Sequence, residues 1–274
     1  MDNHKLRSIT REVGHRYDRA FDRASSGRPH NGFILEASPL PVPPITELKE
    51  CRREEGVFEV VLGQQTKEEV AVNGTHTVYP YKAFAHRYPL ILYLDGVLDE
   101  GNLGAIARTA YFLGVDALIT ATHQTAPWSH IALKSSSGAA EALPIFKVSD
   151  PSTFLEQTSK NGWKIYATAV ESPKMYNDLD DPIVYSLAKS HKVITEDHSP
   201  VAEHPTLLMM GGEGPGLRKG LFHFADYKVG IRHGRSRDEV GVDSLNVSVA
   251  ASLLCYNMLV KRKGGQRDPE NVIF

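Results

Sequence analysis

The chain has 274 residues, a formal net charge of −2 at neutral pH and 41% apolar residues. This length allows one or two domains with a full-sized hydrophobic core. The charge balance excludes a protein held to nucleic acid by bulk positive charge, although it allows a local basic patch. No segment approaches the ~20 apolar residues that a membrane-spanning helix needs. Cys51 and Cys255 fit neither a metal-binding spacing nor a disulfide framework, which favours a reducing compartment.

The beginning of the chain is charged and predicts little regular structure. Residues Met1–Arg28 lack the apolar core of a secretory signal, and their acidic side chains are atypical of a transit peptide. A cluster of prolines over Pro39–Pro44 interrupts regular structure. Short strands are expected over Phe33–Ala37 and Val57–Leu62, and Asn73-Gly74 between two apolar runs predicts a hairpin. Residues 1–84 therefore predict a small partial α+β region without a large core of its own.

From Pro89 onward, apolar strands alternate with helical segments. Residues Leu90–Leu94 are continuously apolar, which is typical of a strand buried on both faces. The expected strands are Leu90–Asp95, Val115–Thr120, Pro144–Val148, Trp163–Val170 and Thr206–Gly211, and the expected helices are Asn102–Leu113, Pro151–Lys160 and Leu245–Val260. This alternation predicts an α/β domain over residues 85–274, with a mostly parallel sheet and helices on both faces.

A long polar connection from Glu171 to Pro205 interrupts the alternation, and a helical piece is expected within it near Ile183–Ser190. Long connections in α/β enzymes often form functional loops, and surface insertions are equally common. The sequence leaves both interpretations of this connection open.

Three loops follow predicted strands, at the sheet edge where open α/β folds bind ligands. The first leads from Asp95 to Asn102, whose side chain can cap the following helix. Gly104 allows a close approach to the first helical turn, and Arg108 follows on the same face. A guanidinium there can bind a phosphate bidentately or polarise a hydroxyl. An exposed surface arginine is an equally good interpretation.

The second loop runs from Gly211 to Arg218 and is rich in glycine. Glycines directly after an apolar strand suggest backbone laid against a ligand. Leu217 stands where a phosphate-binding P-loop would need lysine and where a dinucleotide fingerprint would need glycine, so both are excluded. Glu213 is either a hydrogen-bond acceptor for a ligand or a solvated charge, and the surrounding glycines favour the acceptor.

The third loop precedes the last predicted helix. Asp243 or Ser244 can serve as the N-cap, and Ser244 and Asn246 then present a hydroxyl and an amide beside free N–H donors. The apolar face is expected from residues that recur with helical spacing, namely Leu245, Val249, Leu253, Tyr256 and Leu259. A capped core helix without a ligand is the simpler interpretation of this stretch alone.

In this order, the three loops resemble motifs one, two and three of the SpoU-type RNA ribose 2′-O-methyltransferases, within the SPOUT superfamily. The matching segments are Asn102-x-Gly104-x-x-x-Arg108-Thr109-Ala110, Gly211-x-Glu213-Gly214-x-Gly216-Leu217-Arg218 and Ser244-Leu245-Asn246-Val247-Ser248-Val249-Ala250. Lys134–Ala140 is also similar to the family, and the resemblance covers roughly Pro89–Lys263. Residues Arg28–Leu40 are similar to the member that modifies large-subunit rRNA in mitochondria, in its fungal form.

The resemblance implies a C-terminal trefoil knot, a rare exception to unthreaded topology, and a homodimer. It implies S-adenosylmethionine as the cofactor, held largely through the backbone of Thr168, Gly211, Gly212, Gly216, Ile231 and Leu245. It also implies mitochondrial large-subunit rRNA as the partner and the mitochondrial matrix as the compartment, with neither a metal nor a membrane.

The resemblance further implies a catalytic set for methyl transfer to a ribose 2′-hydroxyl, which is a weak nucleophile unless it is activated. Arg108 would hold the 3′-phosphate or the 2′-oxygen, although its very high pKa makes it a poor plain base. Asn102, Glu213 and Asn246 would orient Arg108 and the ribose. Ser244 would help to hold the substrate or Arg108.

The sequence departs from the family pattern in two places. Only part of the family's N-terminal RNA-binding domain is expected, over about Leu6–Leu40. The loop from Gly230 to Asp243 is long and charged, and it either contacts RNA phosphates or is a surface loop. Two other functions stay open on the sequence: methylation of a tRNA ribose, and a non-catalytic rRNA-binding assembly factor that keeps the fold.

Overall fold

The computed structural model describes residues 18–25, 27, 38–81, 87–169, 182–194, 198–212, 216–234, 240–242 and 244–260. Contacts divide the chain into residues 1–40 and 41–274. In the first unit the structure describes helix α1, Asp18–Ala24. The strand expected over Phe33–Ala37 lies outside the described residues. The predicted division of the chain at residue 84 stays a prediction.

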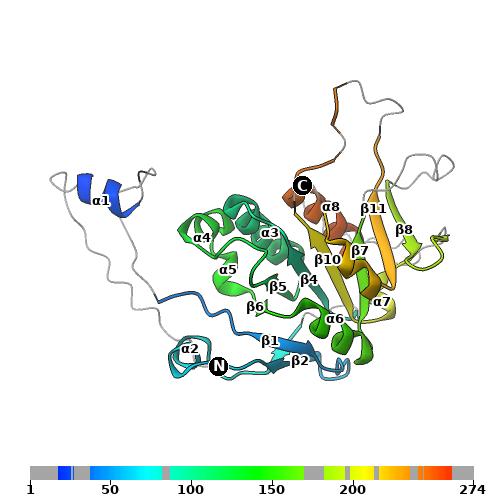
Figure 1. Cartoon of the computed structure of the whole chain (residues 1–274), viewed down its shortest axis with the longest axis horizontal. Helices are drawn as coiled ribbons and strands as arrows, with labels where there is room; N and C mark the ends of the chain where they lie inside the picture. The colour runs from blue at the N-terminus through cyan, green and yellow to red at the C-terminus, as the bar shows by residue number, and fades with distance from the viewer. Residues whose placement is uncertain are drawn as a thin grey trace, which may run out of the picture. The chain divides into compact units, whose positions relative to one another are not determined.

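The second unit is organised around an eight-stranded sheet with the order β6-β5-β4-β10-β7-β11-β8-β9 (Figure 1). Its strands are β4 Leu90–Asp95, β5 Ala117–Ala121, β6 Ile145–Val148, β7 Lys164–Thr168, β8 Ile183–Leu187, β9 Val193–Ile194, β10 Thr206–Gly211 and β11 Tyr227–Ile231. The strands from β6 to β11 in this order pair in parallel, whereas β8 and β9 pair antiparallel at one end. The predicted α/β class with a mostly parallel sheet is confirmed.

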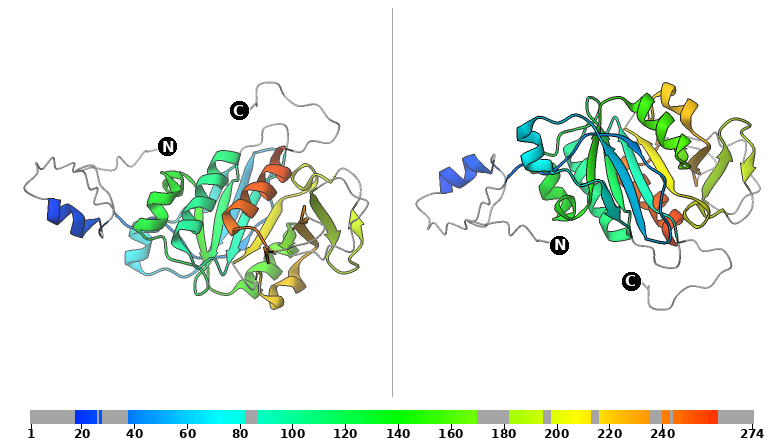
Figure 2. Two further views of the ribbon diagram at one scale, coloured as in Figure 1. Left: turned by 90° about the horizontal axis from the view of Figure 1, so that it is seen from above. Right: turned by 90° about the horizontal axis from the view of Figure 1, so that it is seen from below.

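Helices and a small second sheet cover the large one. The helices are α3 Glu100–Leu113, α4 His130–Ser136, α5 Ala139–Ala142, α6 Pro151–Lys160, α7 Pro200–Glu203, α8 Val247–Val260 and the 3₁₀ helix η4 Lys219–Phe224. Helix α3 packs against α4, α5 and α8, and Figure 2 shows α8 beside α3 on one face. The other face carries α6, η4 and the antiparallel sheet of β1 Ile45–Leu48, β2 Val57–Leu62 and β3 Val78–Pro80.

One hydrophobic core joins the small sheet to the large one. Phe58 of β2 and Trp163, just before β7, are fully buried and share a cluster with Ile91 and Tyr93 of β4. The Trp163 indole N–H donates to the Lys49 carbonyl at 2.8 Å. Residues 41–81 therefore contribute to the core of the second unit, which agrees with the expectation that they lack a large core of their own.

Capping residues define the ends of α6 and α3, and one of them corrects a prediction. Asp150 caps α6, with proline in its first turn, and Gly114 ends α3 in the left-handed conformation at φ 90°. Asn102 was expected to cap α3, but Asp99 caps it: the Asp99 carboxylate accepts from the Asn102 N–H at 2.7 Å. The helix thus begins earlier than predicted, and the side chain of Asn102 is available for other contacts.

The hairpin predicted at Asn73-Gly74 is wrong. Residues Lys67–Asn73 form helix α2, which begins with a capping box between Thr66 and Glu69. Gly74 ends this helix at φ 71°, because glycine adopts positive φ without strain. The capping box outweighs the strand propensity of the valines in this segment.

The helical piece predicted near Ile183–Ser190 is also wrong. Ile183–Leu187 is strand β8, which pairs antiparallel with β11 along its whole length. Its burial pattern places four consecutive residues inside. A short apolar run cannot be assigned to a helix or a strand by periodicity alone, so the partner strand decided its conformation.

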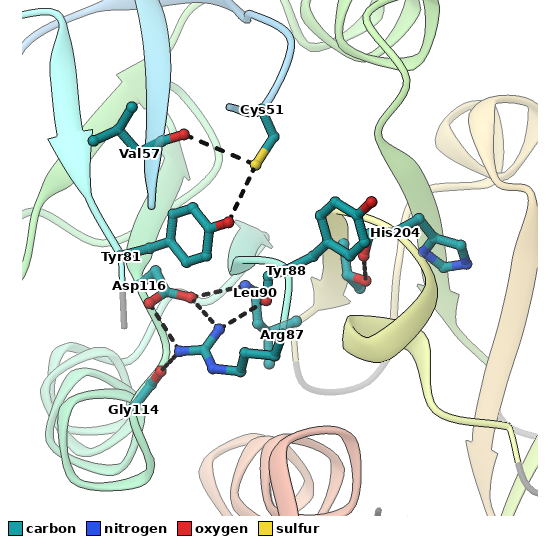
Figure 3. Close-up of polar contacts among 10 residues, drawn as sticks. Cys51, Val57, Tyr81, Arg87, Tyr88, Leu90, Gly114, Asp116 and His204 are labelled. Carbon is teal, nitrogen blue, oxygen red and sulfur yellow. Dashed lines mark hydrogen bonds and ion pairs between the residues drawn. The ribbon is translucent and has the colours of Figure 1, made fainter. Parts of the chain in front are cut away.

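The amino-terminal ends of β4 and β5 are held together by a buried ion pair. Arg87 donates to both carboxylate oxygens of Asp116, at 2.7 and 2.9 Å. Figure 3 shows the guanidinium between that carboxylate and the Gly114 carbonyl, to which it donates at 2.8 Å. Asp116 also accepts from the Leu90 N–H at 2.9 Å. The pair fixes the starts of two neighbouring strands at the edge remote from the predicted site.

Candidate functional site

The candidate site lies at the carboxyl edge of the sheet. Strands β4, β10, β7 and β11 are parallel neighbours, so their carboxyl ends meet at one edge. Gly211 is paired with Asp95 of β4, and Thr168 is paired with Val229 of β11. Ile231 is the last residue of β11. The structure therefore brings the predicted cofactor residues Thr168, Gly211 and Ile231 to the ends of adjacent strands.

The sheet has a topological switch point between β4 and β10, because the chain adds strands on opposite sides of this position. From β4 the chain builds β5 and β6 on one side, and it later places β10 and β7 on the other. Loops that leave such a switch point in opposite directions open a crevice, which is where open α/β sheets bind ligands. The position agrees with the sequence-based expectation for the three loops.

Two residues predicted for catalysis meet here. The Asn246 side-chain amide donates to the Asn102 side-chain oxygen at 3.1 Å. Asn102 lies in the first turn of α3 and Asn246 directly precedes α8. The first and third loops therefore join through this amide pair, although they lie far apart in the sequence.

The predicted cap of α8 needs correction. Asp243 or Ser244 was expected to cap the helix, but the Asn246 side-chain oxygen accepts from the N–H groups of Ser248 at 2.9 Å and Val249 at 3.4 Å. It also accepts from the Ser248 hydroxyl at 2.6 Å. Asn246 thus caps α8 and contacts Asn102 at once, while Ser244 is an exposed residue before the cap.

Arg108 is exposed on α3, and no described residue forms a hydrogen bond or ion pair with it. At 100° per residue it lies about 120° around the helix from Asn102. Thr109, its neighbour, faces α8 and is 3.2 Å from the Ser252 hydroxyl. Arg108 instead shares an exposed stripe with Tyr111 and Phe112. The expected contact of Arg108 with Asn102 and Asn246 stays a prediction.

Gly104 has a different role from the one predicted. A Cβ atom at this position would overlap the Ala132 carbonyl and the Ser135 hydroxyl of α4. The close approach that Gly104 allows is therefore that of a neighbouring helix. The glycine is needed for packing of α3 on α4, and the structure gives it no place in the site.

The glycines of the second loop are used partly by the chain itself. A Cβ at Gly211 would overlap the backbone of Gly216 and Leu217, and a Cβ at Gly212 would overlap the Gly96 carbonyl. Gly216 has φ 66° and open space where a side chain would stand. Of these residues, only the partly buried Gly216 has open space beside its Cα, where a ligand could lie.

The remaining predicted site residues are only partly described. Glu213, Gly214 and Pro215 lie outside the described residues, so the structure does not place Glu213. Leu245 is 47% exposed, two residues before the start of α8. Its predicted contact with a cofactor stays a prediction.

The face of α8 that was expected to be apolar is largely the exposed one. Val249, Leu253 and Tyr256 are 46%, 42% and 50% exposed. The buried face consists of Val247, Ala251, Leu254, Cys255 and Met258. The helix is apolar almost all round, so periodicity could not say which side meets the sheet.

Sequence reasoning missed one ion pair at this edge. Arg218, after the glycine-rich loop, donates to both carboxylate oxygens of Asp95, each at 2.6 Å. These hydrogen bonds raise the pKa of Arg218. The available signal was an aspartate at the end of a continuously apolar strand, because a buried carboxylate requires a partner.

The described part of the chain offers little to other kinds of site. Within it there is no group of three or more His, Cys, Asp or Glu residues placed to hold a metal ion. In the same residues, no helix has both the length and the apolar character needed to cross a membrane.

Comparisons with solved structures support the fold. The SpoU methyltransferase AviRb from Streptomyces viridochromogenes, in complex with AdoMet, superposes with a TM-score of 0.50 at 21% identity. The match covers 76% of this chain and 66% of that one. At this identity the similarity supports the α/β architecture and nothing finer.

Sequence relatives are more informative. The rRNA methyltransferase 1, mitochondrial, of Schizosaccharomyces pombe is 33% identical over 235 residues, which cover 85% of this chain and 69% of the relative. The proteins of the same name from Saccharomyces cerevisiae and Homo sapiens are 33% and 36% identical, and the matches span 55% and 46% of their lengths. The chain thus spans between about half and two thirds of these relatives.

A family model identifies the conserved part of the chain. The model of the SpoU rRNA Methylase family matches residues 89–256, which include all three loops and the sheet edge on which they meet. The match includes Asn102 and Asn246, which form the contact between the first and third loops, and Gly211 at the end of β10. The chain belongs to the SpoU rRNA Methylase family.

Proposed function

We propose that the protein transfers a methyl group from S-adenosylmethionine to the ribose 2′-hydroxyl of a guanosine in mitochondrial large-subunit rRNA. One set of contacts carries this proposal: Asn102 and Asn246 join motifs one and three, and Gly212 of motif two lies against the Gly96 carbonyl in the loop that leads to motif one. The relatives named rRNA methyltransferase 1, mitochondrial, support the substrate and the compartment. A relative named 23S rRNA (guanosine-2′-O-)-methyltransferase, 30% identical, supports the base and the position.

The residues at the carboxyl edge fit S-adenosylmethionine. Thr168 and Ile231 end adjacent strands, and the open backbone at Gly216 can lie against a ligand. When bound, the cofactor supplies an electrophilic methyl group. Thr168, Gly211, Gly212, Gly216, Ile231 and Leu245 are the residues proposed to hold it. Their contribution is placement, because in-line alignment of the reacting groups supplies much of the acceleration in such transfers.

The catalytic residues would act on the RNA. Arg108 is exposed, so its guanidinium can bind the 3′-phosphate or the 2′-oxygen through parallel N–H groups. The Asn102–Asn246 amide pair can orient the ribose, since amides offer both donors and acceptors. We assign Glu213 to orienting Arg108 and the ribose, and Ser244 to helping to hold the substrate or Arg108.

A homodimer is part of the proposal. Val249, Leu253 and Tyr256 of α8 form an exposed apolar surface, and Tyr111 and Phe112 add to the exposed apolar residues of α3. Contiguous exposed apolar patches mark interaction sites. Loss of the dimer after Leu253→Glu, measured by sedimentation, tests this assignment.

The proposed chain topology includes a trefoil knot in its C-terminal half. Strand β7 lies between β10 and β11, both of which come later in the chain. We also propose that residues 1–84 form the RNA-binding region and residues 85–274 the catalytic domain, and that the protein works in the mitochondrial matrix.

The decisive experiment is transfer of labelled methyl groups to a large-subunit rRNA transcript. We expect Arg108→Ala to lower the rate by about a hundredfold or more, as loss of a charge-stabilising donor does, with unchanged thermal stability. The control is Lys160→Ala. The exposed side chain of Lys160 pairs with Glu156 on α6, a helix that carries no predicted site residue. Full activity of Arg108→Ala would contradict the assigned role. Methylation of tRNA in place of rRNA, or absence of S-adenosylmethionine binding, would overturn the proposed function itself.

A further inference from the structure

Asp95 is the point from which the glycine-rich loop is held. Its side chain is completely buried at the end of β4. A buried carboxylate is costly unless it is paired and hydrogen-bonded. The guanidinium that pairs with it belongs to Arg218, the residue at the end of the glycine-rich loop.

Both ends of the loop meet at this one residue. At its start, Gly211 pairs with Asp95 in the parallel register of β10 and β4. At its end, Arg218 binds the Asp95 side chain through Nε and Nη2, each at 2.6 Å. Between them, Gly212 and Gly216 form an antiparallel bridge. The two described ends of the loop, Gly211–Gly212 and Gly216–Arg218, are therefore both held at Asp95.

The same loop is locked against the first loop of the site. The space for a Cβ at Gly212 is filled by the Gly96 carbonyl, which follows Asp95 directly. Leu217, beside Arg218, is buried in the main core. Gly212 and Arg218 of the second loop thus contact Gly96 and Asp95 at the end of β4. The loop that leads to α3 starts from the same place.

Arg218 differs from a purely structural arginine in its exposure. Its side chain is 45% exposed, while the carboxylate that it binds is completely buried. A guanidinium has a planar fork of donors that a lysine ammonium lacks, so the bidentate geometry fixes the direction from which the chain leaves Leu217. The pair therefore fixes the path of the backbone at Arg218 and also neutralises the buried Asp95 carboxylate.

We propose that the Asp95–Arg218 pair is a positioning device that fixes Gly211, Gly212 and Gly216 for the cofactor, so that it governs cofactor affinity more than the chemical step. This inference rests on the proposed binding of S-adenosylmethionine. Ordering a loop before binding removes an entropic cost from the binding step. Losing the pair should therefore weaken binding of the cofactor and leave the rate at saturation nearly unchanged.

The test compares Arg218→Gln and Arg218→Lys with the control Arg87→Gln. The control breaks a bidentate arginine–aspartate pair, with an even more buried arginine, at the opposite end of β4, where no predicted site residue lies. Calorimetry with S-adenosylmethionine gives Kd, and methyl transfer at saturating rRNA transcript gives kcat and the cofactor KM. Thermal melts report stability for all four proteins, including the wild type.

For Arg218→Gln we expect Kd and KM to rise by about tenfold or more, as the loss of a charge-assisted hydrogen bond does, with kcat within about twofold. Arg218→Lys should fall between this variant and the wild type, and it keeps the test valid if Arg218→Gln does not fold. Arg87→Gln should lose stability with unchanged Kd. The inference is overturned if both Arg218 variants bind the cofactor like the wild type, or if kcat falls while KM stays constant. A wild-type protein that does not bind S-adenosylmethionine overturns the proposed function as well.

Discussion

The two ends of strand β4 carry the same kind of ion pair in two different settings. At the amino end, the Arg87 side chain is 13% exposed and donates to two backbone carbonyls as well as to Asp116. At the carboxyl end, the Arg218 side chain is 45% exposed and binds Asp95 alone among the hydrogen bonds described. The amino edge is closed by its own contacts, whereas the carboxyl edge keeps part of its guanidinium accessible.

The residues around the two edges also differ in how closely they are packed. Near the amino edge, Tyr166, Tyr227, His198 and His204 pack ring against ring, and the Tyr166 hydroxyl is 2.8 Å from the His198 Nε2. At the carboxyl edge, polar side chains such as Asn102 and Asn246 are only partly covered. The comparison teaches that one edge of this sheet is closed by its own contacts, whereas the other leaves polar side chains accessible.

The largest expected effect is at the amino edge. Arg87→Gln leaves the Asp116 carboxylate buried without its guanidinium, and breaking a buried pair in this way costs about 3–5 kcal/mol of stability. Chemical denaturation measures the loss. The methyl-transfer kinetics of the folded variant should match the wild type. Changed kinetics in the folded protein would erase the distinction between the two edges.

A second substitution pair tests which face of α8 supports the sheet. Leu254→Ala should cost about 2–5 kcal/mol, because it empties a buried site. Leu253→Ala, its exposed neighbour, should cost the monomer much less. Denaturation at low protein concentration measures both stability losses in the monomer, without a contribution from dimer formation. Equal losses would mean that the exposed face is covered within the monomer.

Asn246→Ala sharpens the comparison at the carboxyl edge. It removes the cap of α8, which costs about 1 kcal/mol, and it removes the donor to Asn102. The rate of methyl transfer should fall much more than this modest loss of stability explains. Ser248→Ala, which removes one hydroxyl donor to the same oxygen, is the matched control. If both variants retain the wild-type rate, the amide pair is only a helix cap.

The smallest expected effect is a dependence of stability on pH. Burial lowers the pKa of His204 to about 4, from an ordinary value of 6.5. Between these values the unfolded chain binds a proton that the folded chain excludes, so stability falls as the pH is lowered from 6.5 and levels off below about 4. Melts across this range should show a shallower dependence in His204→Phe. An unchanged slope would show that the amino edge tolerates the charged imidazole.

The sequence by itself determined the elements that depend on neighbours along the chain. The continuous apolar runs of β4 and β10 identify central buried strands, and Gly114 identifies the end of α3. The three motifs identify the family and place most of the site on loops after strands. These features are local, because they rest on the spacing of residues within one or two turns or one strand.

Only the tertiary structure decided how distant segments meet. Asn102 and Asn246 are 144 positions apart, and Asp95 and Arg218 are 123 apart, so no local pattern predicts either contact. The same applies to the role of Gly104 beside α4 and to the buried face of α8. Strand pairing likewise turned Ile183–Leu187 from an expected helix into β8. The physical reason is that burial and pairing partners come from elsewhere in the chain, and they outweigh local propensity where that propensity is weak.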